Sequence, residues 1–124
     1  MQGNHKLAEE YLKKAKELRM RYYLPSTVNN YRRVKEILDK RGIRLVCVQH
    51  PRRSVESLKK IFEDQHGIIF VDNEKIFEEA IEKDGYKEYF IDIFGEDFGH
   101  CTPKSNRLLA ENIANVILKG VFDK

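Results

Sequence analysis

Two short runs of apolar residues, at residues 43–48 and 67–71, limit the possible folds of this chain more than any other feature of its sequence. Both runs are nearly continuous and rich in β-branched side chains, a composition typical of strands that helices cover on both faces. Gln49-His50-Pro51 ends the first run, because proline cannot continue the hydrogen bonding of a central strand. The sequence therefore predicts two buried strands.

Apolar residues recur at helical spacing through most of the remaining chain. The sequence predicts helices that begin and end near residues 5–21, 28–41, 55–62, 76–81 and 103–117. Gly42 is a typical signal for the end of a helix. Thr102-Pro103 is a typical start, with threonine as the cap and proline at the first helical position. Residues 86–94 are aromatic and apolar, and their pattern does not distinguish helix from strand.

Strands that alternate with helices predict an α/β fold with a parallel sheet. Two strands alone leave an apolar edge of unpaired backbone groups, which proteins normally cover or extend. We therefore expect another copy, a partner chain or a longer parent protein to complete the sheet, including by exchange of elements in a homo-oligomer. Residues 1–124 would then form a single α/β domain or the C-terminal fragment of a larger domain.

Composition argues against several classes of protein. The chain has 23 basic and 20 acidic side chains, interspersed along the helical segments, so we expect no nucleic-acid partner. Cys47 and Cys101 are too few for a disulfide framework and lack zinc-ligand spacing, so we expect no metal. No apolar run reaches 18 residues and the first residues do not resemble a secretion signal. The chain as given is expected to be cytoplasmic and off the membrane, although an upstream segment would leave its location unknown.

Asp97 and His100 are the candidate catalytic residues. They lie three residues apart in a glycine-containing loop just before the last predicted helix. A carboxylate in this position can accept a hydrogen bond from one ring nitrogen and fix the tautomer of the imidazole. The other nitrogen is then free to take a proton from a hydroxyl, as in serine hydrolases. The sequence predicts that Asp97 orients the ring and that His100 is the general base.

Residues 97–114 resemble the C-terminal block of SGNH (GDSL-type) hydrolases, in which the catalytic Asp and His lie three apart before the last helix; here the block begins Asp97-Phe98-Gly99-His100-Cys101-Thr102-Pro103. The resemblance extends over residues 27–118, although only this block is specific. It implies a partial flavodoxin-like three-layer α/β/α fold, no metal or organic cofactor, and hydrolysis of a small-molecule ester, thioester or acetylated sugar.

The chain departs from that family where the nucleophile should be. The family's Gly-Asp-Ser turn has no counterpart, and no serine follows a strand in a glycine-flanked turn; the serines are Ser26, Ser54, Ser57 and Ser105. The resemblance implies that Gly3-Asn4 is a remnant of the block that lends an asparagine amide to the oxyanion hole. Loss of one oxyanion donor costs ~10²–10³ in rate, and loss of the serine costs more. We expect the chain to be inactive alone.

Two functions stay open at this point. The first is the C-terminal part of an esterase that supplies an Asp-His pair, with His50 at a strand end as a substrate-pocket candidate or as a loop histidine without a role. It predicts that Asp97 and His100 meet in a cleft beside space for a hydroxyl. The second is a non-catalytic α/β module for binding or oligomerisation, in which that contact is absent or blocked.

Overall fold

In the computed structural model, which describes residues 2–21, 23–95 and 97–122, helices surround one small parallel sheet. The elements follow in the order α1 (Gln2–Arg21), α2 (Pro25–Lys40), β1 (Leu45–Val48), α3 (Glu56–Lys59), β2 (Ile68–Val71), α4 (Glu74–Asp84), α5 (Tyr86–Tyr89), α6 (Pro103–Ile117) and a π-helical turn, η1 (Leu118–Phe122). The mixed α/β character predicted from the sequence is confirmed, and both predicted strands are present.

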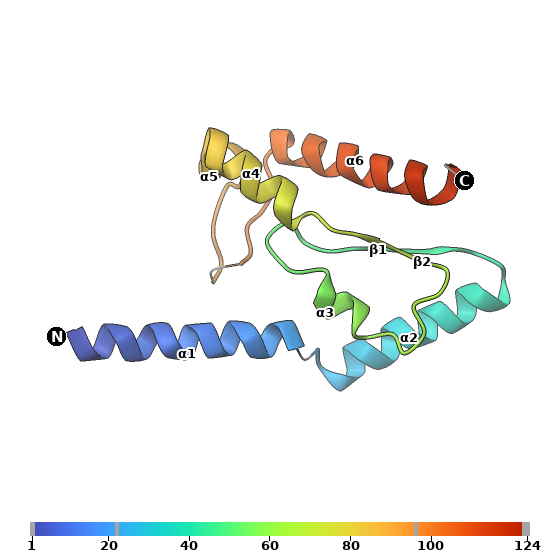
Figure 1. Ribbon diagram of the computed structural model, residues 1–124, viewed down its shortest axis with the longest axis horizontal. Helices are drawn as coiled ribbons and strands as arrows, with labels where there is room; N and C mark the ends of the chain where they lie inside the picture. The colour runs from blue at the N-terminus through green and yellow to red at the C-terminus, as the bar shows by residue number, and fades with distance from the viewer. Residues whose placement is uncertain (1, 22, 96, 123–124) are drawn as a thin grey trace.

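The sheet consists of β1 and β2 paired in parallel, with Leu45 opposite Ile68 and Val48 opposite Val71. Figure 1 shows α6 on one side of the two strands and α2 with α3 on the other side. Cover on both sides explains why the strand sequences are continuously apolar instead of alternating.

Two apolar clusters hold the helices in place. The first lies between β1 and α3 and consists of Cys47, Leu58, Ile61 and Phe62. The second joins α4, α5 and α6 through Phe77, Tyr89 and Phe90, with Leu108 and Leu109 packed against them. Full burial of one such aromatic or aliphatic side chain contributes about 1.5–3 kcal/mol. The second cluster therefore fixes the segment between α5 and α6, which carries the candidate catalytic residues.

The ends of two helices follow local sequence signals. Gly42 has φ of +66°, and the Ile43 N–H donates to the Leu38 carbonyl at 2.9 Å, which closes α2 as predicted. The Thr102 hydroxyl accepts a hydrogen bond from the Ser105 N–H at 3.2 Å, so the predicted start of α6 is also confirmed. Helix α2 begins at Pro25, three residues before the predicted start, because proline at a first helical position loses no hydrogen bond.

Residues 3–15 of helix α1 are largely exposed, and the helix contacts α3. Apolar side chains on it, Leu7, Tyr11 and Leu12, face solvent. Gly3 and Asn4 lie in its exposed first turn. In the described part of the chain, no helix combines the length and apolarity needed to cross a membrane.

One edge of β1 has no neighbouring strand within the described residues. The Gln49 N–H donates to Val71 of β2 at 3.3 Å, and backbone groups point to alternate sides along a strand. Val46 and Val48 therefore direct their N–H and C=O groups away from β2. A groove of about 260 Å³ lies along this edge, lined by β1, α2 and α3 residues that include Tyr31, Val34 and Leu58.

Candidate active site

Residues 90–95 and 97–101, here called the His100 loop, form a short antiparallel ribbon between α5 and α6. The Ile91 N–H donates to the His100 carbonyl at 2.9 Å, and the Phe94 N–H donates to the Phe98 carbonyl at 2.8 Å. Gly95, at φ of +60°, occupies the left-handed region where the ribbon turns. The segment that was ambiguous in the sequence is thus a short helix followed by a ribbon.

Asp92 holds His100 at two points. One carboxylate oxygen accepts the His100 backbone N–H at 2.8 Å, and the other lies 2.8 Å from Nδ1 of the ring. The backbone hydrogen bond, followed by the ring hydrogen bond, lowers the pKa of Asp92 from its usual value. An ionised carboxylate only accepts, so Nδ1 carries a proton, and in the neutral form of the ring the lone pair is on Nε2. The His100 side chain is 60% exposed, which leaves this nitrogen accessible.

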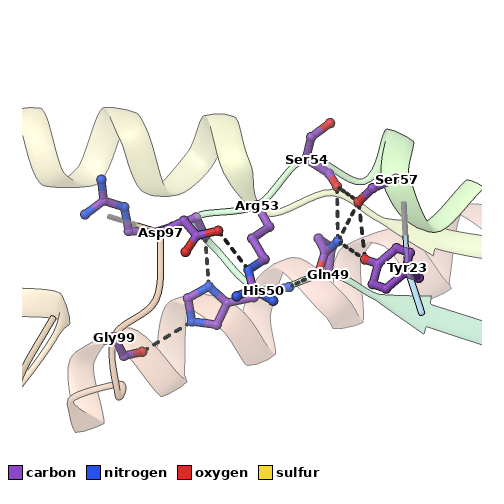
Figure 2. Close-up of polar contacts among 9 residues, drawn as sticks. Tyr23, Gln49, His50, Arg53, Ser54, Ser57, Asp97 and Gly99 are labelled. Atoms are coloured by element: carbon purple, nitrogen blue, oxygen red, sulfur yellow. Dashed lines mark hydrogen bonds and ion pairs between the residues drawn. The ribbon is translucent and has the colours of Figure 1, made fainter. Parts of the chain in front are cut away.

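Asp97 has a different partner from the one predicted. Its carboxylate is 9% exposed and accepts from Arg53 Nε at 3.2 Å (Figure 2), which ties the His100 loop to the segment after β1. The predicted orienting role of Asp97 therefore passes to Asp92. The reason is the ribbon: Ile91 is bonded across it to His100, so the next residue, Asp92, lies beside the imidazole.

Comparison with protein-family models, curated proteins and solved structures finds no significant match to this chain. The resemblance of residues 97–114 to SGNH hydrolases therefore stays a sequence prediction. Evidence about the function comes from the contacts of His100 and its neighbours.

His50, the substrate-pocket candidate of the sequence, makes its described polar contacts with protein atoms. Its Nδ1 accepts the Arg52 backbone N–H at 3.2 Å, and its Nε2 donates to the Gly99 carbonyl at 3.2 Å (Figure 2). The ring also stacks on Phe98, with 4.7 Å between centroids. Both nitrogens and one face are thus engaged by protein atoms, and the ring joins the end of β1 to the His100 loop.

Gln49 anchors the end of β1 from the other side, a role that the sequence analysis did not predict. It is buried, and its Nε2 lies 3.1–3.2 Å from Tyr23 Oη, the Ser54 carbonyl and Ser57 Oγ (Figure 2). Its Oε1 accepts the His50 N–H at 2.9 Å. The backbone that carries His50 is therefore fixed before it reaches the His100 loop.

A second buried network lies where β2 ends. Asn73, with no exposed surface, donates to the Gln49 carbonyl at 2.8 Å and accepts from Asn112 Nδ2 at 2.7 Å. Asn112, on α6, also donates to the Asp72 carbonyl at 2.9 Å. These bonds tie both strand ends to the helix that follows His100.

The other sequence candidates lie elsewhere. Within the described residues no hydrogen bond links Gly3 or Asn4, in the first turn of α1, to the His100 loop. Ser57 donates to the Ser54 carbonyl, and Ser105 is buried in the first turn of α6. Burial raises the pKa of the Cys47 thiol, which disfavours the reactive thiolate. Across the described ranges, no cluster of three His, Cys, Asp or Glu side chains suits a metal.

Proposed function

We propose that this chain supplies the general-base half of a serine-type ester hydrolase site, with His100 as the base and Asp92 as its orienting carboxylate. The observation that carries the proposal is the pair of 2.8 Å contacts from Asp92 to the backbone and Nδ1 of His100. These contacts place a proton on Nδ1, so that in the neutral ring Nε2 is the proton acceptor, in exposed surroundings.

The position of His100 in the fold supports this role. Open α/β sheets build their sites beyond the carboxyl ends of parallel strands. His50, two residues after β1, is hydrogen-bonded to Gly99 next to His100, so the base lies at that edge. A flavodoxin-like SGNH domain, of which this chain would be the C-terminal part, has its catalytic centre at the same edge.

The nucleophile in this proposal comes from a segment that completes the sheet at the open edge of β1. Within the described ranges, Val46 and Val48 direct backbone groups away from β2 without a partner strand, beside the groove of about 260 Å³. A parallel strand added at this edge would end beside the carboxyl end of β1, near His50 and the His100 loop. A serine just after such a strand would lie at the same edge of the sheet as His100.

The reaction then follows the chemistry of an activated hydroxyl. Nε2 of His100 takes the serine proton while the serine oxygen attacks the ester carbonyl carbon. Asp92 stabilises the resulting imidazolium through the Nδ1 hydrogen bond. The imidazolium returns the proton to the departing alkoxide, and water releases the acyl group in the reverse sequence.

A non-catalytic role in oligomerisation is the second candidate, favoured by the open edge itself. Strand addition at such an edge is a common mode of association, with main-chain hydrogen bonds supplying affinity. It makes no use of the Asp92 to His100 pair. The two candidates therefore differ in one respect: only the hydrolase requires His100 to act as a general base.

An exposed imidazole whose Nδ1 is held by a carboxylate, as in His100, can attack activated esters directly, which allows a test without the missing serine. We expect the chain to hydrolyse p-nitrophenyl acetate at pH 7.5 through an acyl-imidazole at Nε2, which releases p-nitrophenolate and is then cleaved by water. His100→Ala should remove most of this rate, whereas His66→Ala, which changes another exposed histidine, should retain it. Fluorophosphonate labelling of the same samples should be negative.

Equal rates for the wild type and His100→Ala would contradict the proposal. Fluorophosphonate labelling that depends on His100 would show that a serine of this chain is already activated, and would overturn the requirement for an added segment. Light scattering on the same samples shows whether the protein is a monomer or an oligomer when these rates are measured.

A further inference from the structure

We propose that His50, held in its neutral Nε2–H form, is the positioning residue of His100. The inference rests on the proposed role of His100 as a base. It assigns to His50 a function distinct from substrate binding: it keeps the His100 loop in register with the end of β1.

The contacts of His50 with the His100 loop are of two kinds. Its Nε2 donates to the carbonyl of Gly99, the residue directly before His100. Its ring stacks on Phe98, and the Phe98 ring in turn meets the His100 ring edge-on, with 5.3 Å between centroids. One side chain from the β1 segment thus holds both residues that precede His100.

The hydrogen bonds also specify the tautomer. The Arg52 backbone N–H can only donate, so Nδ1 of His50 must be unprotonated, while the Gly99 carbonyl can only accept, so Nε2 must carry the proton. His100 has the opposite assignment, with its proton on Nδ1. In their neutral forms, the two histidines of the site are therefore expected to be different tautomers.

Protonation of His50 would disrupt this arrangement. A proton on Nδ1 would point at the Arg52 N–H and replace an attraction with a repulsion between two donors. The charged groups that face the ring are Arg53, Asp97 and Arg52. Burial, with help from Arg53 and then Arg52, lowers the pKa of His50 below its usual value, against the Gly99 hydrogen bond and Asp97.

The lowered pKa of His50 determines how its contacts with the His100 loop depend on pH. Because the folded-state pKa lies below the unfolded value of about 6.5, the unfolded chain binds the proton more readily. The contacts of neutral His50 with the His100 loop are fully present above about pH 6.5 and are lost as pH falls through the folded-state pKa of His50. The position of the His100 loop should change in the same step.

Two substitutions separate the hydrogen bonds of His50 from its stacking on Phe98. His50→Phe keeps a ring to stack on Phe98 but loses both hydrogen bonds, and His50→Gln keeps a donor for Gly99 but loses the stack. His66→Gln changes an exposed histidine and is the matched control. Thermal unfolding followed by circular dichroism establishes that each variant is folded.

Long-range ¹H–¹⁵N spectra of the imidazoles then report the state of His100 without any ester. We expect the wild type to show His50 as Nε2–H and His100 as Nδ1–H, and His50→Phe to lose the single-tautomer signal of His100. The His100-dependent rate with p-nitrophenyl acetate should fall about tenfold or more, since small misplacements of a reacting group are costly. The rate of His50→Gln should lie between the rates of the wild type and His50→Phe.

A folded His50→Phe whose His100 signals and rate match the wild type would overturn the inference. If that variant does not fold, the wild-type titration decides. In this titration, the amide signals of Phe98 and Gly99 must shift over the same pH range as the ring signals of His50. If only the His50 signals shift, the proposed positioning role of His50 is contradicted. A correct His100 response without ester hydrolysis would uphold the positioning role and reject the proposed function.

Discussion

Asn73→Ala is expected to lower the free energy of unfolding by about 3 kcal/mol. Asn73 is fully buried and makes two hydrogen bonds, to the Gln49 carbonyl and to Asn112 Nδ2. The substitution leaves both partners buried, and each unsatisfied group costs about 1–3 kcal/mol. Urea denaturation of the two proteins measures the difference.

Asn115→Ala is the matched control, because Asn115 lies on the exposed side of α6, three residues after Asn112. Its effect should stay within about 0.5 kcal/mol, as for most surface substitutions. A loss below about 1 kcal/mol in Asn73→Ala would mean that water or a shifted side chain replaces the lost bonds. The network would then not be what joins the strand ends to α6.

Gly99→Ala should reduce the His100-dependent hydrolysis of p-nitrophenyl acetate by about tenfold to a hundredfold. A Cβ at this position would lie 2.5 Å from Tyr86 Oη and 2.6 Å from the Asp92 carbonyl oxygen. Tyr86 cannot easily move, since its hydroxyl donates to that same carbonyl at 2.7 Å. The ribbon must therefore open, which pulls Asp92 away from His100.

Gly120→Ala provides the control for adding a methyl group. A Cβ there would lie 3.4 Å from the Ile69 side chain, an ordinary contact, and Gly120 has no unusual backbone angle. Initial rates for both variants, each corrected with a His100→Ala background, give the comparison. A wild-type rate in Gly99→Ala would show that the ribbon geometry does not control His100.

The strands and the start of α6 were predictable because their signals are local. β-branched residues at 45–48 and 68–71 are enriched in strands, and Thr102-Pro103 satisfies helix-start requirements by itself. Helix α3 is shorter than predicted, and Ile61 and Phe62 pack in the first core cluster from the turn that follows it. In residues 60–62, burial of the apolar side chains therefore determines the backbone structure more than their helical spacing does.

The geometry of the proposed site was only partly predictable, because it depends on contacts that are not local. The loop context suggests His100 as a candidate base, but the carboxylate that contacts it is eight residues away and reaches it across a ribbon. That ribbon depends on long-range packing, such as His50 on Phe98, which no periodicity in residues 90–101 reveals. A spacing of three selected Asp97, whereas the fold uses Asp97 to hold Arg53.

The most direct test of the account compares the His100 imidazole in the wild type, Asp92→Asn and Asp97→Asn by long-range ¹H–¹⁵N spectra at neutral pH. Asp92 uses both oxygens on His100, so an amide there must turn its NH₂ toward either the ring or the backbone N–H. We expect Asp92→Asn to lose the Nδ1–H tautomer and Asp97→Asn to keep it. The reverse result, with the tautomer controlled by Asp97, would contradict the assignment of Asp92 as the orienting residue.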